Sequence, residues 1–378
     1  MSLSQAALLL TVGGLFGIGL QRGRVHETSL VAGQMTFSHF VMLKMFLTAC
    51  ASSMLAFVIV EQVFRRKTVR SDYRENFGRG VPAVVLGASI LGVGMALTGS
   101  CPGTVFAQLG AGAGFPALVI LVGGIVGIYI LSLVIAHLDA TGSTFLTDGR
   151  MPASKRCLAV IVTGDENASP TSPAGARVTL AFSAILFSMV LALEYLVDYR
   201  VDAAGVLGSS AAALPRFAIW GPVVPPLIAG LIIGSAQLLA SAGAGRALGT
   251  SSSYACVLGN CLAAGSNSNA CSDKNGNVAY PMSLAKTHRF QVLVVVGIVL
   301  GAFVSALATG ATYVGADFSY LRMFVGGICL TLGSQLCGGC TSGHGLTGLG
   351  LLSTTSAIAV CAMFGSAIGT GVLIKLFF

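Results

Sequence analysis

Long runs of apolar residues, separated by short polar segments, dominate this chain. They cover roughly residues 5–20, 37–64, 81–98, 116–136, 178–197, 217–240, 291–312, 321–336 and 351–378. Many reach the ~20 residues that an α-helix needs to cross the ~30 Å hydrocarbon core of a bilayer. The pattern predicts an all-α polytopic membrane protein. Because no basic segment precedes residue 5, we expect the first run to remain as a span rather than to be cleaved as a signal peptide.

The composition supports this prediction. Hydrophobic residues make up 54% of the chain and charged residues only 9%, whereas soluble proteins carry about 25% charged residues. The net charge of +8 comes from Lys and Arg in short loops between the runs, so it does not indicate a nucleic-acid partner. Residues 65–79 contain six Lys or Arg and two acids, and the positive-inside rule places this loop in the cytoplasm. We expect the protein to lie in the inner or plasma membrane.

A short glycine-lined cysteine motif occurs twice. Both copies read G-x-x-L-x-G-x-C, from Gly94 to Cys101 and from Gly333 to Cys340. The longest polar stretch, 139–177, separates them and is rich in Ser, Thr, Gly and Pro. We therefore expect a first membrane repeat at 1–138, a linker at 139–177 and a second membrane repeat at 178–378.

Each cysteine motif lies within a long window that has no charged side chain. Residues 80–138 and 323–374 contain no Asp, Glu, Lys or Arg, and each window is long enough for two crossings plus a re-entrant hairpin. Gly and Pro break the helix at the motif, and irregular backbone at membrane depth is tolerated only when it is buried in protein or lines a cavity. These windows predict two pseudo-symmetric halves whose short re-entrant or broken helices meet at a central constriction containing Cys101 and Cys340.

Thiols suit particular cargoes. A thiol is soft and polarizable, while glycine amides and half-helix N-termini supply N–H groups and partial positive charge without a buried cation. This combination favours a small anion that carries a terminal sulfur.

Cys337 and Cys340 form C-G-G-C, but the first copy of the motif has Thr98 where the second has Cys337. The duplication therefore argues against a dithiol.

Two alternatives stay open. The first is a membrane thiol-disulfide oxidoreductase that uses Cys337 and Cys340, and the second is a soft-metal transporter. The two windows contain no carboxylate, and their few Met residues show no ligand spacing. We favour a transporter over an enzyme, with no cofactor and no bound metal. Cys256, Cys261 and Cys271 lie around a polar loop, and we favour neither pairing nor metal binding for them.

At these motifs the sequence resembles a known family. "GMALTGSCPGT" at 94–104 and "GGCTSGHGLTGL" at 338–349 resemble the paired motifs of the YeeE/YedE sulfur transport family, the inner-membrane thiosulfate transporters. "GIGLQRGR" at 17–24 and "RALGTSSSY" at 246–254 resemble two further elements of that family. The resemblance implies two pseudo-symmetric halves with a narrow waist, where Cys101 and Cys340 pass thiosulfate on through S–H···S contacts. It also implies sulfur assimilation and delivery to a cytoplasmic sulfur carrier or sulfurtransferase.

The chain departs from the family at one position. The family's opening motif usually continues R-x-R-F-C, whereas this sequence has His26 in place of the cysteine. An imidazole can donate a hydrogen bond to an anion and can carry charge near neutral pH. His26 either replaces an S–H contact near the entrance or marks the loss of that step. The remaining residues that we expect along the substrate pathway are Gln21, Arg22, Gly99, Gly339, Ser342 and His344.

Two of these assignments have a structural alternative. An ionisable residue inside a membrane is functional by default, which favours a pore role for His344 over helix packing. For Arg22 and Arg24, a solvated loop end and an anion-collecting vestibule fit the sequence equally well.

Overall fold

The computed structural model describes residues 2–64, 79–150, 157–163, 172–202, 204, 223–265, 290–315 and 318–377. Within this part of the chain, nine helices are long and apolar enough to cross a membrane. Two of the nine include π-helical turns: α12 runs directly into η3 (Ala240–Ala244), whereas the span that begins with α16 is interrupted at 337–340 and resumes as η4 (Thr341–Leu349). The long helices are α1 (Leu3–Arg22), α3 (Val41–Gln62), α5 (Val81–Thr98), α7 (Phe115–Ala140), α9 (Pro173–Leu196), α12 (Pro226–Leu239), α15 (Phe290–Thr309), α16 (Tyr320–Leu336) and α17 (Thr354–Phe377).

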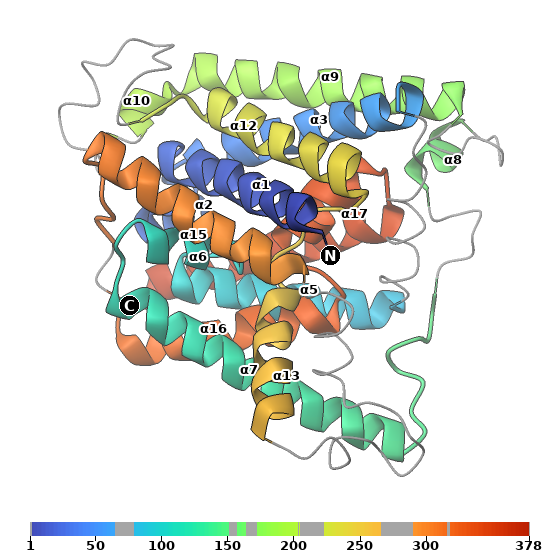
Figure 1. Ribbon diagram of the computed structural model, residues 1–378, viewed down its shortest axis with the longest axis vertical. Coiled ribbons are helices and arrows are strands. Elements are labelled where there is room, and N and C mark those ends of the chain that lie inside the picture. The colour runs from blue at the N-terminus through green and yellow to red at the C-terminus, as the bar shows by residue number, and fades with distance from the viewer. Residues whose placement is uncertain are drawn as a thin grey trace.

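The predicted all-α polytopic class is confirmed, and the long helices form two rows. In one row α9 packs on α3, α3 on α12, α12 on α1 and α1 on α15; in the other α7 packs on α16, α16 on α5 and α5 on α17. Figure 1 shows α9, α3, α1 and α15 in succession from the top of the molecule, with α16 and α7 farther down. The remaining helices are shorter: α2 (Thr28–Met35), α6 (Thr104–Gly110), α8 (Leu158–Thr163), α10 (Tyr199–Asp202) and α13 (Ser252–Gly265).

Short elements connect the two rows. Helix α6 contacts α15 in one row and α7 in the other, and η4 contacts α3 and α17. Helix α2 lies between α3 and α5, and α13 between α15 and α7. Both cysteine motifs lead directly into such elements, α6 and η4. The motifs therefore lie inside the protein between two layers of membrane-length helices.

The two motif helices touch backbone to backbone. A Cβ on Gly94 of α5 would lie 2.7 Å from the Leu330 nitrogen of α16, and a Cβ on Gly333 of α16 would lie 2.4 Å from the Leu91 nitrogen of α5. Superposing one motif on the other matches Gly94 with Gly333 and Leu91 with Leu330. These two contacts are therefore reciprocal, and both require glycine because any side chain would collide with the facing backbone.

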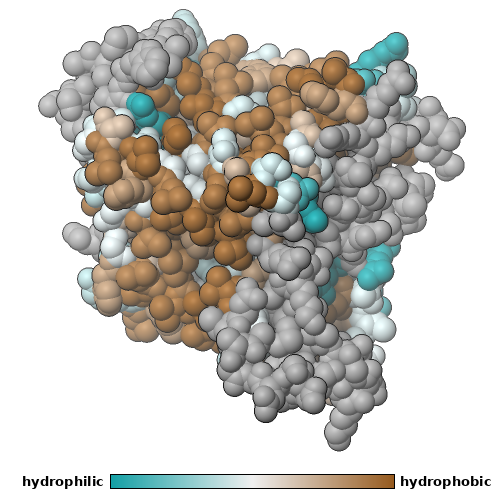
Figure 2. Space-filling model, in the orientation of Figure 1, coloured by the Kyte–Doolittle hydropathy of each residue, from teal (hydrophilic) through white to brown (hydrophobic). Residues whose placement is uncertain are grey.

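The outer surface fits a bilayer. Hydrophobic side chains cover much of the described face in Figure 2, and on α15 the outward residues Leu300, Phe303 and Leu307 are at least half exposed. Many polar side chains are instead buried inside the protein, Gln21, Gln108 and Thr331 among them. Apart from Arg79, the basic loop expected in the cytoplasm lies outside the described residues. In the expected linker, Leu158 N–H donates to the Leu352 carbonyl at 2.9 Å.

Candidate functional site

Both cysteines lie at a break between two helices. Helix α5 ends where Gly99 adopts φ +60°, and a Cβ there would lie 2.5 Å from the Thr28 carbonyl oxygen. The chain then passes through Cys101 before α6 begins. In the second copy, α16 ends before Gly338, which adopts φ +84°, and Cys340 is the N-cap residue of η4. The predicted helix breaks at the two motifs are confirmed.

The Cys101 thiol lies at the start of α6. The backbone N–H of Cys101 donates to Thr104 Oγ1 at 2.7 Å, and the Thr104 N–H donates to Cys101 Sγ at 3.4 Å. The Thr104 hydroxyl donates in turn to the Cys101 carbonyl at 3.1 Å. These three bonds fix the loop, and Cys101 stays partly accessible.

The Cys340 thiol is fully buried among hydroxyl groups. Its Sγ lies 3.1 Å from Ser342 Oγ and 3.5 Å from Thr250 Oγ1. Cys337, the other half of C-G-G-C, has a different environment, because its thiol donates to the carbonyl oxygens of Gly339 at 2.9 Å and Ser334 at 3.5 Å. Cys337 thus bonds to backbone carbonyls of its own segment, whereas Cys340 contacts two side-chain hydroxyl groups, one of which, that of Thr250, comes from another segment.

Residues 246–254 join the two motifs. Thr250, beside Cys340, also lies against the first motif, where a Cβ on Gly103 would be 3.1 Å from its Oγ1. The Tyr254 hydroxyl donates to the Pro102 carbonyl at 3.1 Å. Neither Thr250 nor Tyr254 was expected at the site. A sequence signal for Thr250 exists, since R-x-x-x-T-S occurs at both 24–29 and 246–251.

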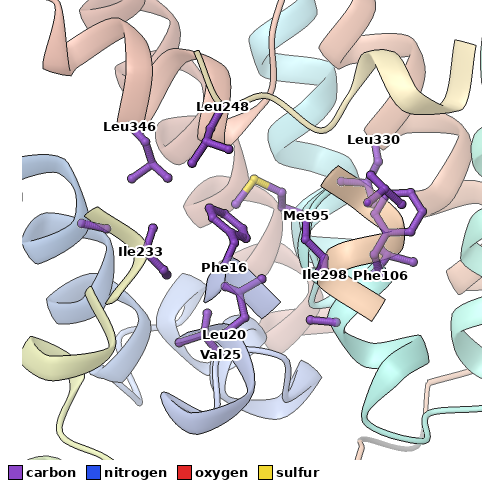
Figure 3. Close-up of a cluster of buried hydrophobic side chains, with 14 of the residues drawn as sticks. Phe16, Leu20, Val25, Met95, Phe106, Ile233, Leu248, Ile298, Leu330 and Leu346 are labelled. Atoms are coloured by element: carbon purple, nitrogen blue, oxygen red, sulfur yellow. The ribbon is translucent and has the colours of Figure 1, made fainter. Parts of the chain in front are cut away.

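A cavity of about 50 Å³ adjoins Cys101. Residues of both motifs line it, including Cys101 from the first and Ser342 from the second, so the structure brings these two predicted residues together. Figure 3 labels five of the other lining residues in the surrounding core: Phe16, Leu20, Val25, Ile233 and Leu346. The complete lining is Phe16, Leu20, Val25, Met42, Met45, Phe46, Ala49, Cys101, Gly103, Thr104, Ile233, Thr341, Ser342 and Leu346.

Gln21 and His26 do not line this cavity, although their neighbours Leu20 at the end of α1 and Val25 in the following loop do. Gln21 Nε2 donates to the Ala311 carbonyl at 2.7 Å, and its Oε1 accepts from the Ser305 hydroxyl at 2.6 Å. Gln21 therefore ties the end of α1 to α15 and the loop that follows it.

His26 is buried in a cluster of charged groups. Its Nδ1 lies 3.4 Å from the Leu20 carbonyl and its Nε2 3.4 Å from the Glu27 carboxylate, which also pairs with Arg24 at 2.8 Å. Burial, together with the positive charge of Arg24, lowers the pKa of His26 to about 3. At neutral pH the imidazole is therefore uncharged. Of the two properties expected of His26, it lacks the positive charge but can still form hydrogen bonds.

The other expected pathway residues hold the site's backbone. His344 is buried, with Nδ1 3.1 Å from Ser356 Oγ of α17 and Nε2 3.2 Å from the Cys337 carbonyl. The backbone of Gly339 accepts the Cys337 thiol, and the Arg22 carbonyl accepts Val224 N–H at 3.1 Å. Through these contacts His344 links η4 to its neighbouring helices.

One hydrogen bond recurs in both halves. Gln108 Nε2 of α6 donates to the His26 carbonyl at 2.9 Å, and Thr347 Oγ1 of η4 donates to the Leu248 carbonyl at 2.9 Å. Aligning the two R-x-x-x-T-S segments matches His26 with Leu248. The element that follows each cysteine, α6 or η4, thus donates a side-chain hydrogen bond to the matching carbonyl of the R-x-x-x-T-S segment. The sequence analysis did not assign this role to Gln108.

The described residues also bear on metal binding and disulfide formation. Among the described residues, no group of three or more His, Cys, Asp or Glu side chains could hold a metal ion. In this part of the chain, Cys50, Cys101, Cys337 and Cys340 are free thiols. The side chains of Cys261 and Cys271 lie outside the described residues.

Membrane-length helices in two rows, with a small polar site buried between them, define a polytopic membrane protein of the transporter class. Comparison with known families is specific: the sulphur transport family matches residues 22–369, and the chain belongs to this family. The chain is also 26% identical, over 356 residues and 93% of each sequence, to the thiosulfate transporter TsuA of Spirochaeta thermophila. The family predicted from the cysteine motifs is therefore confirmed, and with it a role in transport rather than catalysis.

Proposed function

We propose that this protein carries thiosulfate, or a closely related anion with a terminal sulfur, across the membrane for sulfur assimilation. In this proposal the ion passes a constriction formed at Cys101 and Cys340. The observation that carries it is the convergence of two duplicated thiol motifs on one segment, since Thr250 touches Cys340 and lies against Gly103. The similarity to a thiosulfate transporter supports the same cargo.

The two thiols supply selectivity in this mechanism. Thiosulfate and sulfate share charge and tetrahedral shape, and differ in one terminal atom, a large soft sulfur against a small hard oxygen. Cys101 and Cys340 favour the sulfur, because a thiol is a soft donor. Neighbouring hydroxyl groups such as Ser342 donate to oxygen. The dithiol alternative is disfavoured, because the Cys337 thiol is engaged by the Gly339 carbonyl.

The test is labelled thiosulfate uptake into cells that lack their own sulfate and thiosulfate uptake. Cys101→Ser and Cys340→Ser should each reduce uptake strongly without reducing the amount of folded protein in the membrane. Losing ~1.4 kcal/mol at the constriction slows passage about tenfold. Cys337→Ser is the matched control and should keep most uptake. Equal loss from Cys337→Ser and Cys340→Ser would favour the dithiol, and normal uptake by the double variant of Cys101 and Cys340 would refute the proposed role of the thiols.

We also propose that residues 1–138 and 178–378 are repeats related by a pseudo-two-fold axis and joined by a linker at 139–177. The reciprocal contacts of Gly94 and Gly333 support this proposal, as do the equivalent hydrogen bonds of Gln108 and Thr347. Helix pairing supports it as well. In the proposed repeats α5 corresponds to α16 and α7 to α17, and α5 packs on α17 just as α16 packs on α7. An experimental structure in which the two halves superpose poorly would contradict it.

The destination of the cargo belongs to the same proposal. Thiosulfate that enters the cytoplasm needs a sulfurtransferase or a small sulfur carrier to accept its sulfur, and we propose that one receives it from this transporter. Co-purification of a sulfurtransferase with the membrane protein, dependent on thiosulfate in the medium, tests this partner.

A further inference from the structure

A short extended segment, residues 310–315, crosses the face of the protein where α1 and α15 end. We call this segment the strap. It begins and ends at glycines in the left-handed backbone region, Gly310 at φ +64° and Gly315 at φ +76°. Helix α3 follows α1 and α2 in the chain and runs from this face to the basic loop at 65–79 that is expected in the cytoplasm. With that loop in the cytoplasm, the strap lies on the outer face.

A buried ion pair holds the strap from below. Arg24 and Glu27 are 3% and 0% exposed and pair at 2.8 Å. Arg24 donates to the carbonyls of the second and third strap residues at 3.1 and 3.2 Å. The Glu27 carboxylate accepts the N–H groups of the last two strap residues at 3.2 and 3.0 Å. One ion pair therefore binds both halves of the strap through its backbone.

Tyr313 is the large side chain that the strap turns inward. It is partly buried, whereas the strap residues on either side of it are exposed. Its N–H donates to the Ala111 carbonyl after α6 at 3.0 Å, and its hydroxyl lies 3.1 Å from Thr28 Oγ1. Its ring centroid lies 6.4 Å from that of His26. The Thr28 carbonyl in turn meets Gly99 of the first cysteine motif. Tyr313 thus covers the α1–α2 loop, and this loop covers the first motif.

The strap can leave its place at lower cost than a helix can. Within the described residues, the hydrophobic core clusters contain no residue of the strap. Its contacts are polar, and water takes over the hydrogen bonds of polar groups that become exposed. The helices beneath it have no such freedom, because a Cβ on Gly13 of α1 would already collide with the Val294 carbonyl oxygen of α15. The strap is therefore a mobile element on a rigid frame.

We propose that the strap is the outer gate of this transporter. It swings about Gly310 and Gly315 and withdraws Tyr313, which opens the outer side of the first cysteine motif, and the ion pair of Arg24 and Glu27 latches it shut. The structure holds the gate in its closed state. The proposal rests on the proposed function, and it gives gating roles to residues that need not touch the cargo.

The rate at which an impermeant reagent reaches Cys101 measures the gate. Intact cells that carry the protein are treated with a negatively charged methanethiosulfonate, and modification of Cys101 is quantified by mass spectrometry. Tyr313→Ala removes the side chain that joins the strap to the α1–α2 loop, and Glu27→Gln removes the negative charge of the latch. Each should speed modification about tenfold. Tyr195→Ala, at a tyrosine of α9 that is 83% exposed, is the control and should leave the rate unchanged.

A matched pair of glycines tests the hinge. Gly310 and Gly142 adopt φ +64° and +65°, and a Cβ at either position would meet nothing within 4 Å. Alanine therefore introduces the same backbone strain at both sites without a collision. At Gly310 the strain is relieved when the strap opens, so Gly310→Ala should speed Cys101 modification roughly tenfold. Gly142→Ala should not change the rate.

Locking the strap distinguishes a gate from a fixed cap. Thr28→Cys combined with Tyr313→Cys places thiols on two residues whose hydroxyl groups lie 3.1 Å apart. A short bis-methanethiosulfonate then joins the strap to the α1–α2 loop. Labelled thiosulfate uptake should fall to background after cross-linking and return on reduction. Each single variant, treated in the same way, should keep its uptake.

The outcomes separate the gate from the cargo. Uptake that persists with the strap cross-linked would overturn the gate, and so would Cys101 modification rates that Tyr313→Ala and Gly310→Ala leave unchanged. If Glu27→Gln is poorly folded, these two variants decide the labelling experiment. Absence of thiosulfate uptake by the unaltered protein would instead overturn the proposed function, and the labelling rates, which need no cargo, would still test the gate.

Discussion

Gln108 connects the Cys101 loop to the α1–α2 loop, and its replacement by Leu tests that connection. Gln108 Nε2 donates to the His26 carbonyl at 2.9 Å and to Ser100 Oγ at 2.7 Å, and its Oε1 accepts from the Ser100 hydroxyl at 3.0 Å. The side chain is 1% exposed, so water does not take over these bonds when they are lost. Leu fills much the same volume, which leaves the hydrogen bonds as the main change.

The size of the effect follows from which groups lose their partner. Ser100 keeps an alternative acceptor, the Thr98 carbonyl at 3.3 Å, whereas the buried His26 carbonyl loses its side-chain donor. An unsatisfied buried acceptor costs about 1–3 kcal/mol, and each lost hydrogen bond adds about 1 kcal/mol. We therefore expect Gln108→Leu to lower the free energy of unfolding by roughly 2–4 kcal/mol. Uptake per folded molecule should fall as well, because the loop is no longer tied to Cys101.

Thermal unfolding of the purified protein in detergent measures the loss, and a double-mutant cycle with Ser100→Ala tests its origin. The two substitutions remove the same pair of bonds, so we expect a coupling energy of about 1 kcal/mol between them. Thr347→Val is the matched change at the equivalent position, and it removes the 2.9 Å bond to the Leu248 carbonyl and a longer one, 3.4 Å, to Gln237 Oε1. Its cost should have the same sign and be smaller. A Gln108→Leu protein that unfolds like the original, or purely additive effects with Ser100→Ala, would refute the reasoning.

Three further changes have defined outcomes. Gly99→Ala should abolish uptake and lower the yield of folded protein, since a side chain at φ +60° would meet the Thr28 carbonyl oxygen 2.5 Å away. His26 has a folded-state pKa of about 3, below the ordinary 6.5, so the stability from its neutral form is complete above pH 6.5 and is lost as pH falls toward 3. The free energy of unfolding of His26→Gln should therefore fall less steeply as the pH falls from 6.5 toward 3, by about 1.4 kcal/mol per pH unit, and thermal unfolding across this range measures the difference. Lys44→Met should cost roughly 3 kcal/mol in thermal unfolding, since it leaves Glu194 without its 2.9 Å partner, and adding Glu194→Gln should recover part of that loss.

Much of the membrane architecture could be predicted from the sequence, because apolar length alone defines a crossing. The run at 81–98 coincides with α5, and the run at 116–136 lies within α7. Helix ends were harder to predict. The first run was expected to begin at residue 5, but α1 begins at Leu3 because Ser2 and Gln5 form a capping box. The run at 37–64 starts before α3, because apolar residues there occupy a loop.

The candidate site could be predicted only in part. Duplication identified Cys101 and Cys340, because two copies of one pattern can be compared within a single chain. It did not identify Thr250 or Gln108, whose importance depends on distances between segments far apart in sequence. Nor did it give the charge of His26, because the burial that lowers its pKa is a property of the folded protein.

The backbone-to-backbone contact of α5 and α16 limits how this transporter can move. Sliding between helices normally takes place over a layer of side chains that can change rotamer, and this layer is missing where Gly94 meets Leu330 and Gly333 meets Leu91. A shear of the two halves along this pair would drive peptide groups into each other. The contact therefore holds α5 and α16 in a fixed register. In the proposed function, the movements that let an ion pass then fall to side chains and short loops around the thiols. Such local movements are faster than the hinge motion of whole domains, so turnover should depend little on large-scale rearrangement.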